Sequence, residues 1–329
     1  MAKLTARKKK VIIVLSVILA VILLIVGSAA AILSYAFGSL KRDNSLPKDP
    51  EKLGVTSETQ EKSESADITN IALFGLDTRA MDDSGRSDAI IILSIDKKHN
   101  SLKLSSIARD TYAAVEGYEK TKINHAYAYG GAELAIKTLN QNFNMDIKDY
   151  VSVNFEQLAN VIDYLGGVTV NITEEELSHA NEKLASMGTE SGLYSDPIPG
   201  TGDVQLNGLQ AVAYSRVREV GGDTARTSRQ REVLEALFNK VKGANITQYP
   251  AIINKLLDSV QTSLSYTEIM DLGMWAVGSN PAWKTTVFPN KECNSSGQYI
   301  GDLWYYVYDL DNAANILHRF IYDDIQPAE

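Results

Sequence analysis

The stretch ITNIALFGLDTRAMDDSGRSDAIIILSID, residues 68–96, holds two apolar runs separated by a polar loop. Each run, 68–76 and 88–96, has the length of a strand and is rich in β-branched residues, which predicts two β-strands. After the short polar connection KKHN, the segment SLKLSSIA at 101–108 alternates polar and apolar residues. This spacing predicts that residues 88–108 form a β-hairpin.

Helical and strand patterns interleave along the rest of the chain. Apolar residues recur at helical spacing in three segments, and VTVNI has the composition of a short strand. The predicted helices cover 130–143, 154–167 and 231–243, and the predicted strand covers 168–172. A further helix is expected to begin at a capping box, in which Thr173 is followed by Glu176. We therefore predict one α/β domain, residues 68–329, with a central mixed β-sheet flanked by helices.

The first forty residues indicate a membrane anchor. Residues 1–10, MAKLTARKKK, are basic, and Val11 to Leu40 contain no Asp, Glu, Lys or Arg. A bilayer core needs roughly 20 apolar residues, so we predict a transmembrane helix over 11–36, with the basic tail left in the cytoplasm. A cleaved signal peptide is the alternative, since SAAA at 28–31 contains small residues, but its apolar region spans only roughly 7–15 residues.

The residues after the predicted span are polar, mixed in charge and almost free of large apolar groups. This composition predicts a flexible extracellular linker over 37–67. The folded domain is then expected outside the cell, close to the outer face of the membrane.

Composition excludes several classes of function. The formal charge of −9 argues against nucleic-acid binding, because duplex binding depends on broad phosphate neutralisation by Lys and Arg. Cys293 is the only cysteine, so no internal disulfide forms, and the four histidines are not in metal-ligand spacing. The chain also lacks the GxxxxGK[ST] pattern of a P-loop and the GxSxG pattern of a nucleophile elbow.

Arginine is concentrated in two windows of the sequence. Eight of the eleven arginines lie in these windows: Arg79, Arg86 and Arg109, then Arg216, Arg218, Arg226, Arg229 and Arg231. Lysines are spread along the chain, as expected of a solvated surface. The planar guanidinium forms bidentate contacts with phosphate or carboxylate, so its segregation indicates anion binding. The alternative is a solvated helix face on which the arginines pair with nearby glutamates, and Arg231 fits that alternative best.

Spacing within the second window, AYSRVREVGGDTARTSRQRE, suggests how its arginines converge. An extended segment would point Arg216 and Arg218 to the same side. A helix that begins by Thr224 would place three further side chains on one face, namely Arg226, Arg229 and Gln230. The GGD turn between the two segments would bring both sets together.

The first window also holds two spaced carboxylates. Asp77 ends one predicted strand and Asp88 opens the next, beside a loop that contains Gly and Ser. Mg²⁺ binds one or two carboxylates and completes its octahedron with phosphate oxygens and water. Turn chemistry is the alternative for acidic loop residues, and it suits Asp82 and Asp83. With arginines interleaved, Asp77 and Asp88 indicate a site for a metal ion and a diphosphate.

Five motifs in order resemble the LytR-CpsA-Psr family: LFGLDTRAMDDSGRSDAIIILSID, ARDT, KINHAY, LNGLQAVAYSRVRE and GGDTARTSRQR. The resemblance is clear over residues 68–245. It implies a phosphotransferase on the outer face of the membrane of a Gram-positive bacterium. Such an enzyme moves an anionic glycopolymer, of the teichoic acid or capsule type, from a polyprenyl-pyrophosphate carrier to a sugar hydroxyl of peptidoglycan.

The resemblance also implies roles for individual residues. The metal ligands would be Asp77 and Asp88, holding Mg²⁺ or, in its place, Mn²⁺. The pyrophosphate-binding residues would be Arg79, Arg86, Arg109, Arg216, Arg218, Arg226, Arg229 and Gln230, with Asp77, Arg109 and Arg218 catalytic. An apolar pocket is expected for the prenyl chain. Two positions depart from the family pattern, because Ala108 replaces a proline and Ala225 replaces a glycine.

Two other functions remain open from the residues alone. One is a membrane-tethered regulator that binds polyprenyl phosphates without chemistry, and the other is a pyrophosphatase in which water is the attacking group. The pair of candidate metal ligands favours the two catalytic functions. The general base, either Asp110 or a metal-binding carboxylate, is not decided by the sequence.

Overall fold

The computed structural model describes residues 42–77, 85–244, 252 and 259–328. The predicted cytoplasmic tail 1–10, the predicted span 11–36 and Arg79 lie outside the described residues. Within the described ranges, none of the helices combines the length and the apolar character that crossing a membrane requires.

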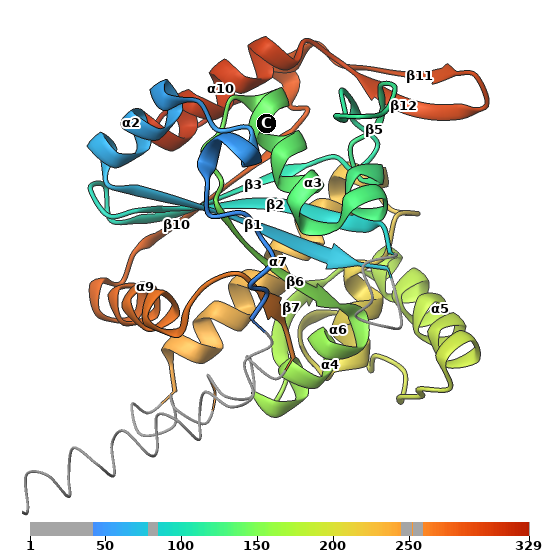
Figure 1. Ribbon diagram of the computed structural model, residues 1–329. Coiled ribbons are helices and arrows are strands. Elements are labelled where there is room, and N and C mark those ends of the chain that lie inside the picture. The colour runs from blue at the N-terminus through green and yellow to red at the C-terminus, as the bar shows by residue number, and fades with distance from the viewer. Residues whose placement is uncertain (1–41, 78–84, 245–251, 253–258, 329) are drawn as a thin grey trace, which may run out of the picture. The chain divides into compact units, whose positions relative to one another are not determined.

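A six-stranded mixed sheet forms the centre of the domain, with strand order β10-β3-β2-β1-β6-β9 (Figure 1). β1 (Ile68–Leu76) pairs antiparallel with β2 (Ser87–Asp96), and β2 pairs antiparallel with β3 (Ser101–Ile107). The hairpin predicted over 88–108 is therefore confirmed.

Three further strands extend the sheet on both sides. β6 (Asp149–Asn154) lies parallel to β1, and β10 (Ala282–Phe288) lies parallel to β3. β9 (Gln261–Thr262) closes one edge by pairing antiparallel with β6. Parallel and antiparallel pairs occur in the same sheet, which confirms the predicted mixed architecture.

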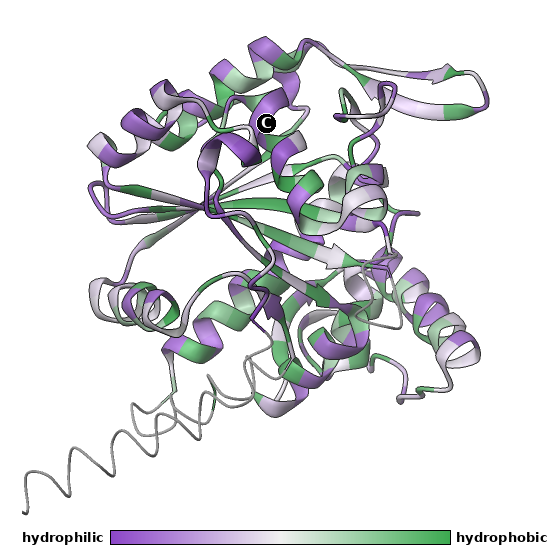
Figure 2. Ribbon diagram, in the orientation of Figure 1, coloured by the Kyte–Doolittle hydropathy of each residue, from purple (hydrophilic) through white to green (hydrophobic). Residues whose placement is uncertain are grey.

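Helices cover both faces of this sheet (Figure 1). One face packs against α2 (Ser57–Ala66), α3 (His125–Phe143) and α10 (Leu310–Tyr322), and the other against α7 (Gly222–Lys242) and α9 (Tyr266–Ser279). The alternation of side chains along a strand explains this division. Phe74 joins the first core, whereas its neighbour Leu73 joins the second. Figure 2 shows the strands largely hydrophobic and α2 largely hydrophilic.

A smaller layer lies beside the sheet and carries part of the site. The hairpin of β7 (Val168–Ile172) and β8 (Gly202–Leu206) packs with α4 (Phe155–Tyr164), α5 (Glu174–Ser191) and α6 (Gly208–Ser215). The predicted capping box of Thr173 and Glu176 starts α5.

Two short hairpins complete the domain beyond the sheet. β4 (Tyr112–Ala113) pairs with β5 (Thr121–Lys122), and β11 (Ser296–Ile300) pairs with β12 (Leu303–Val307). The β11–β12 hairpin projects from the body of the domain (Figure 1). Thr111 forms an isolated parallel bridge with Tyr306, which joins the base of one hairpin to the other.

The prediction that residues 37–67 form a flexible linker is wrong for the described part, 42–67. A 3-10 helix, η1 (Pro50–Leu53), and α2 fold onto the domain, and Leu53 is fully buried. The Asn140 side-chain amide donates to the Leu53 carbonyl at 2.8 Å, and the Ser63 and Tyr322 hydroxyls lie 2.7 Å apart. The polar residues of this segment cap helices and form hydrogen bonds, which average composition does not distinguish from solvation.

The expected extended segment around Arg216 is also wrong. α6 continues to Ser215, and Arg216 is its C-cap. The helix begins at a capping box of Asn207 and Gln210, and every residue of α6 except Leu209 is buried. A short, continuously buried apolar run has no clear period, so its sequence does not distinguish a helix from a strand.

We predict that Gly208→Ala destabilises the domain. A Cβ at Gly208 would lie 2.0 Å from the Ala159 carbonyl oxygen, because α6 crosses α4 in backbone contact there. The expected loss in the free energy of unfolding is roughly 1–3 kcal/mol or more. Thermal unfolding of the full-length chain in detergent measures it.

Gly273→Ala in the exposed helix α9 is the matched control, because a Cβ there meets nothing within 4 Å. Its stability should stay unchanged or rise by up to about 1 kcal/mol from helix propensity. Equal stability of the two variants would contradict the proposed close approach of α6 and α4.

Candidate functional site

One edge of the sheet gathers charged residues from three strand ends. Asp77 follows β1, Asp88 lies at the start of β2, and Arg109 comes two residues after β3. Since β1 and β3 run in one direction and β2 in the other, these positions meet at the same edge. The Asp77 amide donates to the Arg86 carbonyl at 3.1 Å and closes the base of the intervening loop.

A polar cavity of about 310 Å³ lies at this edge. Its lining includes predicted and unpredicted residues: Asp77, Gly85, Arg86, Asp88, Arg109, Asp110, Lys122, Asn124 and His125. The cavity therefore brings together both predicted metal ligands and two arginines of the first window.

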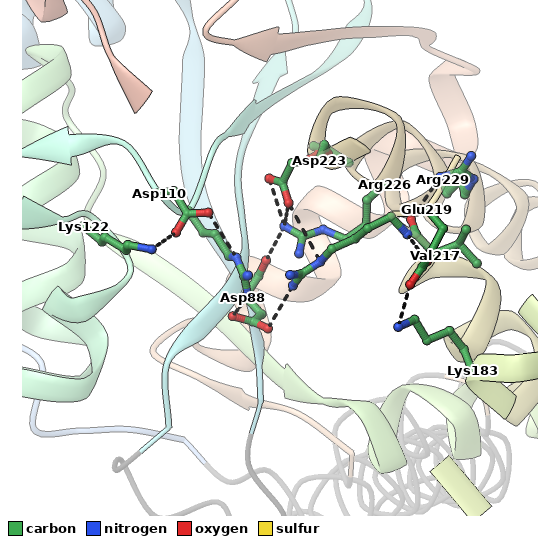
Figure 3. A network of polar contacts seen from close by, with 12 residues as sticks. Asp88, Asp110, Lys122, Lys183, Val217, Glu219, Asp223, Arg226 and Arg229 are labelled. Carbon is green, nitrogen blue, oxygen red and sulfur yellow. Dashed lines mark hydrogen bonds and ion pairs between the residues drawn. The ribbon is translucent and has the colours of Figure 1, made fainter. Parts of the chain in front are cut away.

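Arg109 is held between two carboxylates. Its Nη1 donates to Asp88 Oδ1 at 2.5 Å, and its Nε lies 3.7 Å from Asp110 Oδ2. Lys122 Nζ contacts the other Asp110 oxygen at 2.7 Å, so the chain of charges continues toward β5 (Figure 3). Burial alone would lower the pKa of Arg109, but Asp88 and Asp110 raise it above its ordinary value. The guanidinium is therefore charged at every relevant pH.

The second arginine window reaches the same carboxylate from the opposite side (Figure 3). Buried Arg226, in the first turns of α7, contacts Asp223 Oδ1 at 2.9 Å and donates to the Asp88 carbonyl at 3.5 Å. Arg218 Nη2 lies 4.0 Å from Asp88 Oδ2, and its side chain is 43% exposed. Segments more than 100 residues apart in sequence thus converge on Asp88.

The neighbouring carboxylates only partly balance the positive charge around Arg226. Burial lowers the pKa of Arg226 to about 10, and the nearby guanidinium groups of Arg218 and Arg109 add to the effect against the pull of Asp223. Within the described part of the chain, the buried Nε atoms of Arg109 and Arg226 have no hydrogen-bond partner. Buried donors without acceptors are costly, so this arrangement favours the arrival of an anion.

Arg216 lies apart from these three arginines. Its guanidinium lies over the Phe155 ring, with its central carbon 4.8 Å from the ring centroid. It lines a second cavity of about 230 Å³ between α4, α5 and α6, whose apolar residues are Phe155, Met187, Leu193 and Leu209. Asp77 lines both cavities, so a polar and a partly apolar space adjoin at this residue.

Arg229 and Arg231 point away from the polar cavity. Arg229 donates to Glu176 Oε1 at 2.8 Å and to the carbonyls of Val217 and Val220 at 3.0 and 2.9 Å. It thus fixes the turn that carries Arg218 (Figure 3). The expectation that Arg231 is solvated is wrong, because it is buried and its Nη1 donates to Ser106 of β3 at 3.3 Å.

The remaining predicted positions divide between cavity and helix. Arg86 is exposed and lines the polar cavity. Gln230 is half-buried on α7 and does not line either of the two described cavities. The sequence alone therefore does not distinguish the arginines that line the cavity from those that stabilise the fold, and the structure is needed to separate them.

Four residues of the site were not predicted as such: Lys122, Asn124, His125 and Asp223. The first three belong to the KINHAY motif at 122–127. This motif comes after ARDT, which directly follows β3. Burial lowers the pKa of His125, with Arg86 and Lys122 adding to the effect, so the imidazole is neutral at pH 7. Asp223 resembled an ordinary turn residue in sequence.

The donor set at the sheet edge fits a magnesium ion. Asp77 and Asp88 supply carboxylate oxygens on neighbouring strand ends that line one cavity, and oxygen ligands are those that Mg²⁺ prefers. A different acidic group, Asp96, His99 and Asp324, lies at the far end of β2. There the ammonium of Lys103 contacts Asp96 at 2.6 Å and Asp324 at 3.0 Å. The positive charge of Lys103 therefore takes the place that a metal ion would occupy between these carboxylates.

The chain is similar to proteins of known family. A family model described as LytR_cpsA_psr family matches residues 35–320. Two relatives are named polyisoprenyl-teichoic acid–peptidoglycan teichoic acid transferase TagU. The Bacillus licheniformis protein is 30% identical, covering 79% of this chain and 81% of its own length. The Oceanobacillus iheyensis protein is 32% identical, covering 84% and 80%.

Solved structures share the fold. A Streptococcus agalactiae protein matches with a TM-score of 0.66 and 24% identity, covering 83% of this chain and 93% of its own. TagT with bound octaprenyl pyrophosphate lipid matches with a TM-score of 0.58 and 22% identity, covering 77% and 90%. These structures confirm the α/β fold with a central mixed sheet.

We predict that Arg229→Met unfolds the site rather than only weakening binding. The change would leave Glu176 and two carbonyls without their donor, at a cost of about 3–5 kcal/mol for a mostly buried pair. Arg218→Met is the matched control, since that side chain is 43% exposed and should change stability by less than about 0.5 kcal/mol. Thermal unfolding of both full-length variants measures the difference, and similar unfolding temperatures would contradict the structural role of Arg229.

Proposed function

The chain belongs to the LytR_cpsA_psr family, and from this premise we propose that it transfers an anionic glycopolymer of the teichoic acid or capsule type to peptidoglycan. The donor in this proposal is a polyprenyl-pyrophosphate-linked polymer, and the acceptor is a sugar hydroxyl. The observation that carries the proposal is the convergence of Arg109, Arg218 and Arg226 on Asp88, beside a partly apolar cavity.

The two adjoining cavities suit the two halves of the donor. The guanidinium groups of Arg109, Arg218 and Arg226 bind the pyrophosphate in this proposal. Arg109 and the exposed Arg86 line the polar cavity, and Arg218 and Arg226 reach Asp88 beside it. The apolar residues of α4, α5 and α6 bind the beginning of the prenyl chain, and Arg216 lies at their border with Asp77. TagT, which shares this fold, was solved with bound octaprenyl pyrophosphate lipid, and this supports a polyprenyl pyrophosphate as the class of ligand.

The reaction proposed is an in-line displacement at phosphorus. The acceptor oxygen forms a bond to the phosphorus that carries the glycopolymer, and the bridging P–O bond of the pyrophosphate breaks. Polyprenyl phosphate leaves, and a phosphodiester links the polymer to peptidoglycan. Arg109, Arg218 and Arg226 stabilise the negative charge on the phosphate oxygens and on the leaving group, so positioning and electrostatics supply most of the rate.

Asp77 and Asp88 would hold Mg²⁺ in this proposal, and Mn²⁺ would replace it. When bound, such an ion neutralises charge on the phosphate oxygens. Asp88 also fixes Arg109, and Asp77 is exposed at the junction of the two cavities. The proton of the acceptor hydroxyl needs a base, and Asp77 is the carboxylate of the cavity without an ion pair to another described residue.

Location follows from the same proposal. Residues 1–10 stay in the cytoplasm, 11–36 span the plasma membrane, and the described domain works on the outer face, within the cell envelope. The names of the relatives, which are cell-wall transferases, support a cell-envelope location.

We predict that Arg218→Ala lowers transfer by roughly 10²–10³-fold, the loss typical of removing one donor that stabilises developing charge. The assay uses the full-length chain in detergent with Mg²⁺, a prenyl-pyrophosphate-linked saccharide and peptidoglycan oligomers. Arg319→Ala is the matched control, because Arg319 is similarly exposed and pairs with Glu292 away from both cavities. A covalent saccharide–phosphate–glycan product supports transfer, released saccharide phosphate alone supports hydrolysis, and binding without either product contradicts an enzyme.

Chelation of divalent cations should abolish transfer, and added Mg²⁺ should restore it. Asp77→Asn should shift the restoration curve to higher Mg²⁺ concentration, because an amide is a weaker ligand than a carboxylate. Asp203→Asn in β8, outside both cavities, should leave the curve unchanged. Full turnover in the presence of chelator would remove the metal from the mechanism.

A further inference from the structure

The β11–β12 hairpin carries a row of aromatic residues on one face. The two strands pair with Tyr299 opposite Trp304 and Gly297 opposite Tyr306. Residues that face each other across an antiparallel pair point to the same side of the sheet, so Tyr299, Trp304 and Tyr306 share one face. Alternate residues of one strand lie about 7 Å apart along the backbone. We call these three side chains the aromatic row.

Packing orders the inner part of the aromatic row and leaves its outer part open. Trp304 and Tyr306 meet edge to face, with ring centroids 4.5 Å apart. The Trp304 ring also lies against Gly297, where a Cβ would come within 2.5 Å of it. Tyr299, next to the Gly301–Asp302 turn, is 73% exposed. Tyr299 and the partly exposed Trp304 form contiguous aromatic surface, and contiguous exposed apolar surface marks binding sites.

The opposite face of the hairpin anchors it to the domain. Tyr305 is buried and packs edge to face on Tyr112 of β4, with ring centroids 5.0 Å apart. Lys122 Nζ lies 5.8 Å from the Tyr305 ring centroid while it also contacts Asp110. The hairpin is therefore fixed at its base. On the aromatic row Trp304 and Tyr306 are half-buried and Tyr299 is exposed, and near the turn the opposite face exposes Ile300 and Leu303.

The aromatic row begins next to Asp110, which lines the polar cavity. The Tyr306 amide donates to the Asp110 carbonyl at 2.9 Å, one residue from Arg109. The Tyr306 hydroxyl forms a hydrogen bond with Thr224, next to Asp223 in the first turn of α7. One end of the row thus touches the elements that carry the arginines, and the other end points outward along the hairpin (Figure 1).

We propose that the aromatic row binds the acceptor glycan strand of peptidoglycan and leads one of its sugars to the polar cavity. This inference rests on the proposed transferase function. A β-linked N-acetylhexosamine chain is a row of pyranose rings whose C–H groups form apolar faces, and these faces pack on the electron-rich faces of aromatic rings. Tyr hydroxyls and the Trp304 indole N–H supply hydrogen bonds to sugar hydroxyl and amide groups.

The aromatic row and the arginine cluster differ in charge, so they suit different substrates. The row and the paired Gly297 contain no charged side chain, whereas the adjacent cavity contains the arginine cluster. An anionic glycopolymer is attracted to the arginines, while a glycan backbone gains from stacking on uncharged rings. The two substrates therefore approach the same phosphorus from different surfaces.

The test measures glycan binding apart from transfer. The full-length chain in detergent is titrated with chitotetraose, a β-1,4-linked N-acetylglucosamine tetramer, and binding is followed by calorimetry. Tyr299→Ala and Trp304→Ala should each weaken binding at least 10-fold, and Tyr299→Phe, which keeps the ring, should retain it. Tyr164→Ala at the end of α4 is the matched control, since Tyr164 is also exposed and lies outside the hairpin.

Transfer kinetics supply the second readout. Both alanine variants should raise KM for peptidoglycan oligomers at least 10-fold, with KM for the lipid-linked donor and kcat at saturating acceptor unchanged. Because Tyr299 is exposed, its removal tests the inference even if Trp304→Ala loosens the hairpin. A change in donor KM alone would overturn the assignment to the acceptor.

Three other outcomes would overturn the inference. In the first, the unaltered chain fails to bind chitotetraose. In the second, the alanine variants bind it as tightly as the unaltered chain. In the third, KM for peptidoglycan oligomers stays unchanged in the variants while they lose self-association or vesicle binding. Absence of transfer by the unaltered chain, with chitotetraose binding that depends on Tyr299, would instead contradict the proposed function and leave the glycan site supported.

Discussion

The carboxylate of Asp88 holds the arginine cluster together. Arg109 donates to one of its oxygens, Arg218 lies 4.0 Å from the other, and Arg226 donates to its main-chain carbonyl. Like charges brought this close repel one another strongly where burial lowers the dielectric response. The negative charge of Asp88 reduces this repulsion, but one carboxylate does not neutralise three guanidinium groups. Asp88 lies near the start of β2, between Ser87 and Ala89, which pair with Leu76 and Gly75 of β1, and these two pairs fix its position.

Local sequence patterns were sufficient for the elements around Asp88. The runs 68–76 and 88–96 have strand length and composition, and their pairing follows from the short connection to 101–108. Arginine segregation predicted two segments that the structure brings together at Asp88, because arginine suits anions for a chemical reason that holds in any fold. The strand ends and the arginine windows were therefore predictable before their distance in space was known.

Residues whose role depends on a distant neighbour were not predictable in this way. Arg229 and Arg226 are three positions apart on one helix, yet only Arg226 reaches Asp88, while Arg229 is saturated by Glu176 and two carbonyls. Arg231 is buried because α7 packs on β3, a contact that spans more than 100 residues of sequence. Helical periodicity describes which side chains share a face but does not identify what covers that face.

The fold of residues 42–67 ties this segment to the sheet that carries the proposed site. Arg42 bridges to Thr262 of β9, which lies opposite Val151 of β6, and the partly apolar cavity begins four residues later at Phe155. Leu53 is buried in the same core as Phe74 of β1, the strand that precedes Asp77. The segment is therefore held by the two strands whose ends reach the cavities. Composition alone could not show this, because polar residues that cap helices and form buried hydrogen bonds have the same average composition as a solvated linker.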